Sequence, residues 1–199
     1  IMKKTVAIIG AGASGLLCAI ECAKKSLDVS IYEQNEKCAK KILVSGNGRC
    51  NITNTVTSSQ DYFSQNPLFV HDALSQYSFK EFEKFTSSIG LMLEIKADGK
   101  VYPQSNEAKS VASLLEHTAR NLGVSFHMST KITDIQKLIS EYDYVIVATG
   151  SQAAEHLGGN EDGHNFAQDF GHTLVASYPS LVQLHLNSSS HTKMSGAKV

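Results

Sequence analysis

One stretch decides the fold of this chain: Val6-Ala7-Ile8-Ile9-Gly10-Ala11-Gly12-Ala13-Ser14-Gly15. Its first four residues form an apolar run without alternation, which is typical of a strand buried on both faces of a parallel sheet. After the glycines, apolar residues recur at helical spacing from Ser14 to Lys25, and a second strand follows from Val29 to Glu33. This order predicts a βαβ unit of about 30 residues.

The glycines of this stretch have separate mechanical tasks in such a unit. Gly10 permits the tight turn, Gly12 lets the backbone approach a pyrophosphate, and Gly15 allows the helix to pack closely on the strand. The free amides at the helix N-terminus carry about half a positive charge. Glu33, at the end of the second strand, would accept hydrogen bonds from the hydroxyls of an adenosine ribose. These residues predict a dinucleotide-binding site rather than a turn that only requires glycine.

Glu33 also restricts which dinucleotide fits. A 2′-phosphate about 4 Å from its carboxylate would be repelled by roughly 4 kcal/mol at an effective dielectric near 20. The next residues, Gln34 and Asn35, supply no cation to offset this repulsion. The sequence therefore disfavours NADP at this position and leaves FAD or NAD.

Patterns along the rest of the chain predict further elements in an α/β order. We expect a parallel sheet with helices on both faces, a loop over residues 36–54, and a polar linker from Thr55 to Ser59. The expected helices are Phe79–Ile89 closed by Gly90, Glu107–Leu122, and a short one at His164–Phe170. The expected strands are a hairpin from Leu91 to Tyr102 through Asp98-Gly99, then Val124–Met128, Tyr144–Ala148 and Leu181–Leu186, with a small antiparallel ribbon at Lys131–Ile139.

Composition and charge exclude several classes of protein. The 199 residues are 42% apolar and 19% charged, which is the profile of a globular chain and excludes disorder. With 18 basic and 19 acidic side chains, the chain has no basic surplus for nucleic acid. The apolar stretch at the N-terminus is interrupted by glycines and is too short to span a membrane. The four cysteines lack CxxC spacing, and we expect a cytoplasmic protein.

Two later segments separate FAD from NAD. Tyr142-Asp143-Tyr144-Val145-Ile146-Val147-Ala148-Thr149-Gly150 resembles the YDxxIxATG segment of flavoproteins with two dinucleotide-binding domains, in which a late strand ends against the cofactor. Lys40-Lys41-Ile42-Leu43-Val44-Ser45-Gly46-Asn47-Gly48-Arg49-Cys50-Asn51-Ile52-Thr53-Asn54 is crowded with small and hydrogen-bonding residues beside one arginine. Such a loop can wrap a diphosphate or a ribityl chain. A domain that binds only NAD has no segment like Tyr142–Gly150, so this segment favours FAD.

Together with Gly99-Lys100-Val101-Tyr102-Pro103-Gln104-Ser105 and Gly171-His172-Thr173, these motifs resemble the aminoacetone oxidase and BaiN-type family of NAD(P)/FAD-dependent oxidoreductases. The resemblance covers almost the whole chain. It departs from the family at Ser151–Ala154, in the Gly158–Gly163 loop and at Gln183, so the substrate is the part that transfers least.

The resemblance implies an α/β, Rossmann-like FAD-binding domain of the type with two dinucleotide-binding domains. Residues 2–178 would be the N-terminal part of a discontinuous FAD domain, and residues 179–199 would begin an inserted β-rich domain that is truncated here, in a protein of about twice this length. Motif and resemblance together predict these FAD-binding residues: Gly10, Gly12, Ala13, Ser14, Gly15, Glu33, Gln34, Lys41, Ser45, Gly46, Gly48, Arg49, Cys50, Asn51, Thr53, Lys131, Ile132, Ala148, Thr149 and Gly150.

The implied activity is transfer of a hydride or two electrons through FAD. The donor would be a nicotinamide, NADH or NADPH, or an amine-like compound, and the acceptor would be oxygen or a small unsaturated substrate. Two alternatives stay open: a binding module without turnover, and a flavin-dependent RNA-modifying enzyme, which would call for a basic surface. We expect a small-molecule substrate, no nucleic-acid partner and no membrane contact, and the oligomeric state is left open.

The remaining candidates favour structural roles. Cys50 could form a redox pair with the flavin, but a lone cysteine in a tight loop favours packing. Cys18 and Cys22, one helical turn apart, are expected in the core. His164 and His172 could approach the flavin, although a capping or surface role is favoured. No HxxxH or HExxH pattern occurs, so no metal is expected, and no side chain is identified as the catalytic proton donor.

Overall fold

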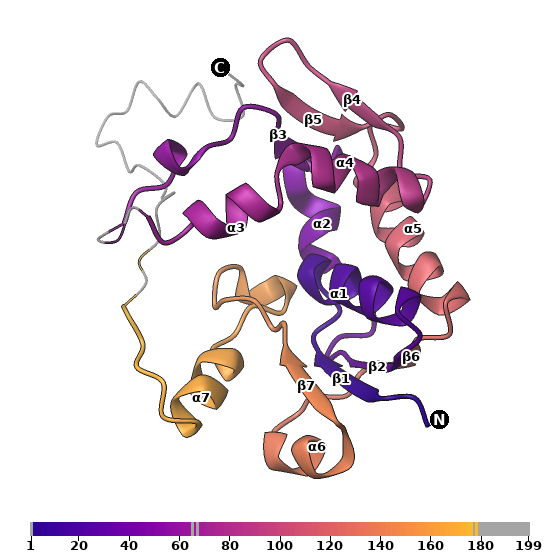
Figure 1. Cartoon of the computed structure of the whole chain (residues 1–199), viewed down its shortest axis with the longest axis vertical. Helices are drawn as coiled ribbons and strands as arrows, with labels where there is room; N and C mark the ends of the chain where they lie inside the picture. Colours follow the sequence, from indigo (N-terminus) through magenta and orange to yellow (C-terminus); the bar gives the residue numbers. More distant parts are fainter. Residues whose placement is uncertain (1, 65, 67, 177, 179–199) are drawn as a thin grey trace, which may run out of the picture.

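The computed structural model describes residues 2–64, 66, 68–176 and 178, and its central feature is a four-stranded parallel sheet. The strands are β1 (Thr5–Ile9), β2 (Asp28–Tyr32), β6 (Ser125–His127) and β7 (Tyr144–Val147), in the order β6-β2-β1-β7. In the register, Val6 lies opposite Val29 on one side and Tyr144 on the other. Strand β1 is therefore internal, and its carboxyl end lies between those of β2 and β7 (Figure 1).

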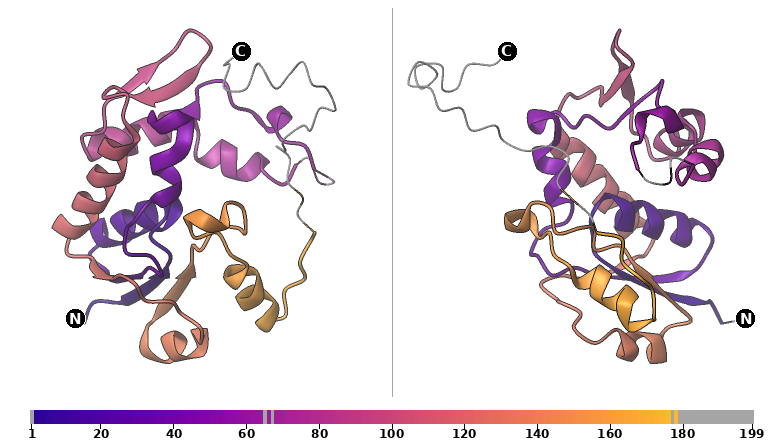
Figure 2. Two further views of the ribbon diagram at one scale, coloured as in Figure 1. Left: turned by 180° about the vertical axis from the view of Figure 1, so that it is seen from behind. Right: turned by 90° about the vertical axis from the view of Figure 1, so that its left-hand side faces the viewer.

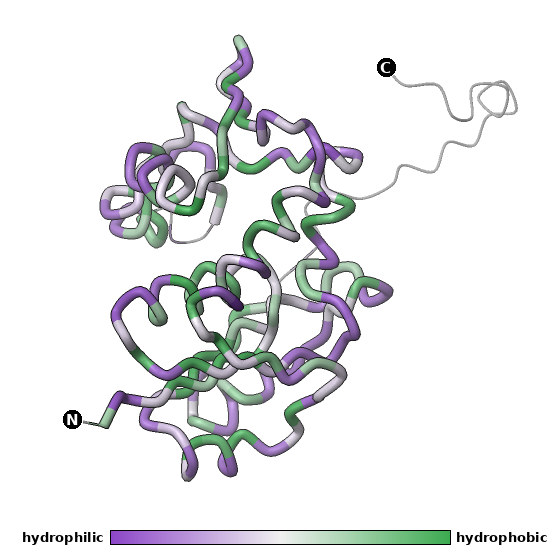
Figure 3. Tube along the Cα trace, turned by 90° about the vertical axis from the view of Figure 1, so that its right-hand side faces the viewer, coloured by the Kyte–Doolittle hydropathy of each residue, from purple (hydrophilic) through white to green (hydrophobic). Residues whose placement is uncertain are grey.

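Helices cover both faces of this sheet, as the sequence predicted. Side chains that alternate along β1 pack on different helices. Val6 and Ile8 belong to the cluster with α1 (Ala13–Lys24) and α5 (Ala108–Asn121), while Ala7 and Ile9 pack with α6 (Ile135–Glu141) and α7 (Asp162–Asp169). Figure 2 shows these layers from two sides, and Figure 3 shows hydrophobic residues gathered in the sheet region. The continuous apolar run of β1 is thus explained by burial on both faces.

A second, antiparallel sheet lies apart from the parallel one. It consists of β3 (Thr53–Asn54), β5 (Lys100–Pro103) and β4 (Leu93–Ile95), in the order β3-β5-β4. The β4–β5 hairpin turns at Gly99, which has a φ of +80°, as the Asp98-Gly99 pair predicted. It follows α4 (Phe79–Ser88), which ends before Gly90 at a φ of +78°. Within the described residues, no helix has the length and apolarity needed to cross a bilayer.

Two sequence predictions about local structure are wrong. Residues 36–54 are not only a loop, because they contain α2 (Lys40–Val44), the 3-10 turn η1 (Ser45–Gly48) and β3. A five-residue helix is too short to show periodicity, which explains the error. The predicted ribbon at Lys131–Ile139 is absent, and α6 begins within this range at Ile135: Asp134 caps the helix by accepting from the Gln136 amide, and Ile135 and Leu138 are buried.

Other short elements were not predicted. The structure has η2 (Ser59–Asp61), which begins at the last residue of the predicted linker, α3 (His71–Gln76), and η3 (Glu155–Leu157). Cys18 and Cys22 are half-buried and pack against the core from α1. The predicted strand Leu181–Leu186 and the predicted second domain, 179–199, lie outside the described residues.

Candidate functional site: a nucleotide pocket at the carboxyl ends of three strands

The turn after β1 can be built only with glycine at two of its positions. Gly10 has a φ of +106°, and a Cβ there would lie 2.6 Å from the carbonyl oxygen of Ala148. Its amide donates to the carbonyl of Tyr32 at 2.8 Å, so the turn is fixed to β2 as well. A Cβ on Gly15 would collide with the Gly10 carbonyl. These close contacts let α1 begin directly beneath the carboxyl end of β1.

Gly12 has the opposite surroundings. A Cβ built there would meet no atom of the described residues within 4 Å, so this position faces open space. Gly12 is also the N-cap of α1, and no side chain of the described chain caps this helix end. The first helical bond runs from the Leu16 amide to the Gly12 carbonyl, at 3.0 Å. The amides of Ala13 and Ser14 therefore have no intrahelical partner, and both residues line the pocket, so these amides are available to an anion such as a pyrophosphate.

Glu33 follows β2 and is held beside this turn. Only 7% of its surface is exposed. One carboxylate oxygen, Oε2, accepts from the Ala11 amide at 2.8 Å, and the other, Oε1, accepts from the backbone and side-chain amides of Asn35 at 2.8 and 2.6 Å. The carboxylate is thereby fixed at the edge of the turn, with acceptor capacity left on its oxygens for a ligand.

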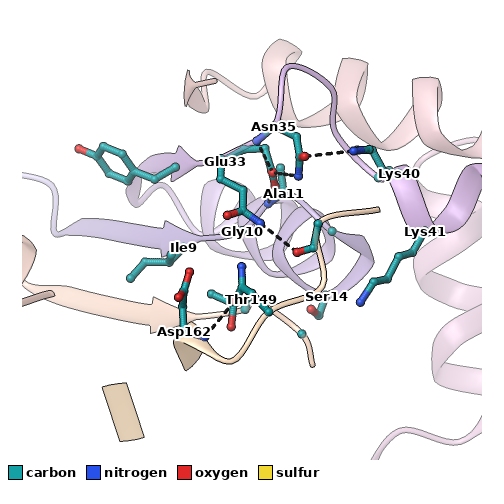
Figure 4. Close-up of a pocket in the computed structure, with 18 of the residues that line it drawn as sticks. Ile9, Gly10, Ala11, Ser14, Glu33, Asn35, Lys40, Lys41, Thr149 and Asp162 are labelled. Carbon is teal, nitrogen blue, oxygen red and sulfur yellow. Dashed lines mark hydrogen bonds between the residues drawn. The ribbon is translucent and has the colours of Figure 1, made fainter. Parts of the chain in front are cut away.

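A pocket of about 330 Å³ lies above these groups, at the carboxyl ends of β1, β2 and β7. In open α/β sheets, ligands bind at this edge. Its volume falls at the lower end of the roughly 300–1,000 Å³ range of ligand sites. Figure 4 shows Gly10, Ser14, Glu33, Thr149 and Lys41 arranged around it.

The pocket lining also includes lysines and a segment from the end of β7. Lys41, on α2, donates to the carbonyl of Ser151 at 3.3 Å. Gly150 has a φ of +80° and lies close to this lysine, since a Cβ there would be 3.8 Å from the Lys41 Nζ. Lys131 forms an ion pair with Asp162 of α7 at 3.0 Å. Lys41 thus brings positive charge next to backbone groups that follow β7, although Lys41 and Ser151 are more than 100 residues apart in the sequence.

The structure brings together most of the predicted FAD-binding residues. The following predicted residues line the pocket: Gly10, Gly12, Ala13, Ser14, Glu33, Gln34, Lys41, Lys131, Ile132, Ala148, Thr149 and Gly150. Gly15 lies behind the turn and supports it. The remaining predicted residues do not line it: Ser45, Gly46, Gly48, Arg49, Cys50, Asn51 and Thr53. Their role as cofactor contacts therefore stays a prediction.

The segment that contains these remaining residues folds back on the small sheet. The Ile52 amide donates to the Val101 carbonyl at 2.9 Å, and the Arg49 guanidinium lies 5.3 Å from the centre of the Tyr102 ring. Cys50 is 5% exposed, and burial raises the pKa of its thiol. A raised pKa disfavours the reactive thiolate, so the environment of Cys50 fits packing better than redox chemistry.

Several pocket residues were missed by the sequence analysis. Asn35 donates to the Glu33 carboxylate, and Lys40 Nζ donates to Asn35 Oδ1 at 3.1 Å. Phe166 and Asp162 come from α7, far along the chain. Asn35 gave a signal, since it lies two residues after Glu33, but the approach of Lys40 depends on α2. His164 and His172, considered as flavin neighbours, do not line the pocket.

Fold and site together define a Rossmann-type dinucleotide-binding domain. Residues 4–178 match the model of the HI0933-like protein Rossmann domain, and the chain belongs to this family. The resemblance to BaiN-type flavoproteins is thereby confirmed at the family level, and the family supports FAD as the dinucleotide. In the described part of the chain, no three His, Cys, Asp or Glu side chains are grouped to hold a metal ion.

Curated relatives are similar over nearly the whole chain. A 3-dehydro-bile acid delta(4,6)-reductase of Clostridium scindens is 34% identical, over 97% of this chain and 50% of its own length. A ribosomal RNA dihydrouridine synthase of Haemophilus influenzae is 29% identical, over 88% of this chain and 47% of its own. The chain thus spans about half the length of the curated relatives it matches.

Solved structures share the fold at low identity. A flavocytochrome c3 fumarate reductase in an open conformation has a TM-score of 0.52 at 15% identity, over 83% of this chain and 40% of that one. A 3-ketosteroid-delta4-(5alpha)-dehydrogenase of Rhodococcus jostii RHA1 has a TM-score of 0.50 at 13% identity, over 77% of this chain and 47% of its own. The predicted fold class is confirmed.

Proposed function

We propose that the protein represented by this chain is an FAD-dependent oxidoreductase in which residues 2–178 hold the adenosine diphosphate half of FAD. The observation that carries this proposal is the meeting of Glu33 with the uncapped N-terminus of α1 in one pocket. The open space at Gly12 fits a pyrophosphate, because backbone can approach a ligand closely there.

The residues of this chain have distinct tasks in binding. Glu33 accepts hydrogen bonds from the ribose hydroxyls, the amides of Ala13 and Ser14 donate to the phosphates, and Lys41 adds positive charge near them. When bound, FAD supplies the two-electron transfer. This chain orients the nucleotide and offers no identified proton donor for the reaction.

We propose NADH or NADPH as the electron donor and a small unsaturated organic compound as the acceptor. The relative from Clostridium scindens supports this acceptor, because its name is that of a 3-dehydro-bile acid delta(4,6)-reductase. The charge balance of this chain also favours a small molecule. No nucleic acid or membrane is part of this proposal.

The second candidate is an RNA-modifying flavoenzyme. It is favoured by the relatives named ribosomal RNA dihydrouridine synthase, one of Haemophilus influenzae and one of Escherichia coli. The two candidate functions differ in the electron acceptor, which is a small unsaturated compound in the first and RNA in the second. The identity of the acceptor therefore separates them.

An absorbance spectrum of the complete protein tests the first part of the proposal. We expect a yellow protein whose visible flavin absorbance is bleached by NADH or NADPH without oxygen. A colourless protein that binds NAD would contradict FAD, and a yellow protein that neither nicotinamide reduces would indicate a binding module or a different donor.

The reduced protein then tests the acceptor. We expect a 3-oxo-delta4 steroid, used as a small unsaturated probe, to restore the flavin band anaerobically, whereas ribosomal RNA transcripts leave it bleached. Reoxidation by RNA alone would favour the second candidate. Reoxidation by oxygen alone would indicate an oxidase.

A further inference from the structure

The hydrogen bonds of Glu33 continue beyond its carboxylate to a lysine. Oε1 accepts from Asn35 Nδ2 at 2.6 Å, and Asn35 Oδ1 accepts from Lys40 Nζ at 3.1 Å (Figure 4). A carboxylate can only accept and an ammonium can only donate. The amide between them is therefore fixed in one orientation, with its nitrogen toward Glu33 and its oxygen toward Lys40.

The surroundings of Asn35 hold this amide in place. Its backbone amide also donates to Glu33 Oε1, and its carbonyl accepts from the Ser129 amide at 3.1 Å. Gly158 packs against the side chain so closely that a Cβ there would lie 2.5 Å from Asn35 Nδ2. Lys40 is held from the same segment, since its Nζ also donates to the His156 carbonyl at 3.4 Å. The chain Glu33–Asn35–Lys40, which we call the relay, is thus supported by a loop more than 100 residues away.

The relay offsets the cost of burying the Glu33 carboxylate. A carboxylate with 7% exposure loses most of its hydration, and this is costly unless hydrogen bonds or opposite charge replace the water. None of the ion pairs found among the described residues includes Glu33. Lys40 supplies positive charge one amide away, and it polarises the Asn35 amide toward the carboxylate.

We propose that Asn35 and Lys40 are positioning residues that act through Glu33 in recognition of the nucleotide ribose. They occupy Oε1, so that the remaining acceptor capacity of the carboxylate stays available to the ribose hydroxyls. The inference rests on the proposed nucleotide binding and adds the residues that orient its ribose contact. It also assigns a task to Lys40. In the sequence, the residues directly after Glu33 supply no cation, whereas in the structure Lys40 supplies one through Asn35.

Two nucleotides test this assignment on the complete protein after removal of bound flavin. ADP carries both ribose hydroxyls and 2′,3′-dideoxy-ADP carries neither, so the ratio of their dissociation constants, measured by calorimetry, reports the ribose contact. We expect the wild-type protein to bind ADP about tenfold or more tightly than the dideoxy nucleotide, because hydrogen bonds to a charged group are involved. Glu33→Gln should lower this preference to about twofold.

The relay variants should resemble Glu33→Gln. We expect Asn35→Ala and Lys40→Met each to lower the preference to threefold or less, and Lys40→Arg to restore at least half of it. Lys37→Met is the matched control, because it removes the same charge from the same pocket. It should leave the ratio as in the wild type. Thermal unfolding of every variant checks that loss of preference is not loss of folding.

The outcomes separate this inference from the proposed function. If Glu33→Gln loses the preference while Asn35→Ala and Lys40→Met keep it, the relay is overturned and nucleotide binding stands. Equal loss in Lys37→Met would also overturn it, since general positive charge would then explain the effect. If the wild-type protein contains FAD but binds both nucleotides equally, the relay fails alone. If it binds neither FAD nor ADP, the proposed function fails with it.

Discussion

Two glycine-rich segments of this chain behave differently, although both were predicted to contact the cofactor. The 10–15 turn lies between two paired strands and a helix, and it lines the pocket. The 45–54 segment packs on the small antiparallel sheet and does not line it. The first segment is fixed by its immediate neighbours in the chain, whereas the second depends on distant parts. Spacing within a motif therefore predicts geometry only where adjacent elements enforce it.

The largest effect is expected in the first segment, from Gly10→Ala. The new Cβ would meet the Ala148 carbonyl at 2.6 Å on a backbone with a φ of +106°, so we expect a loss of about 3 kcal/mol in the free energy of unfolding. Gly12→Ala is the matched change, because its Cβ meets nothing within 4 Å among the described residues. It should unfold within about 0.5 kcal/mol of the wild type but lose flavin, since the Cβ occupies ligand space.

Urea unfolding and the flavin absorbance per protein measure both variants. Equal unfolding free energies for the two would show that the close contacts at Gly10 are not what fixes the turn. If Gly12→Ala keeps its full flavin content, the prediction that the pyrophosphate lies against Gly12 is wrong.

A medium effect is expected in the second segment. If the 45–54 segment contacts FAD beyond its adenosine diphosphate half, Arg49→Met should weaken FAD binding about tenfold, the size of one lost charged hydrogen bond. Binding of ADP should stay unchanged, because Arg49 does not line the pocket. Calorimetry with the two ligands makes the comparison. If Arg49→Met binds FAD and ADP as the wild type does, Arg49 does not contact the cofactor. If it binds both ligands more weakly, Arg49 acts at the adenosine diphosphate end of FAD.

The smallest effect is expected from two exposed carboxylates, one at each sheet, that form ion pairs with lysines. Asp143, directly before β7, accepts hydrogen bonds from Lys4 Nζ at 2.6 Å and from the Thr5 amide at 2.8 Å. The hydrogen bond from Lys4 is the main cause that lowers the pKa of Asp143 to about 2. In the hairpin of the small sheet, bonding to Lys100 likewise lowers the pKa of Asp98. A lowered folded-state pKa stabilises the fold above the unfolded pKa near 3.9, and this contribution is lost as pH falls through the folded value.

Asp143→Asn should therefore be less stable than the wild type by a constant margin between pH 5 and 8. The margin should shrink below about pH 4 and vanish only below about pH 2, as judged from urea unfolding at each pH. Asp98→Asn should follow the same direction. A margin that grows toward low pH would contradict the assignment for either residue.

Much of the fold was predictable because its signals are local. The buried run from Val6 to Ile9, the glycines and Glu33 lie within one βαβ unit, and the Asp98-Gly99 pair marks its own hairpin. The helix α6 was missed because its signal is a single cap at Asp134 on a seven-residue helix. The relay from Glu33 to Lys40 was hidden for another reason: α2 must first form to bring Lys40 to Asn35, and Gly158, which packs on Asn35, comes from the loop after β7, more than 100 residues along the chain.

The place of β1 in the sheet has a consequence for synthesis on the ribosome. Its first partner, β2, follows within a few tens of residues, but Thr5 reaches Asp143 across 138 positions. At about 5–20 residues per second, one side of β1 waits roughly 7–28 s for β7. The pocket, which takes backbone from both β1 and β7, is complete only after this delay. The turn that carries the glycines is therefore made well before the pocket to which it belongs.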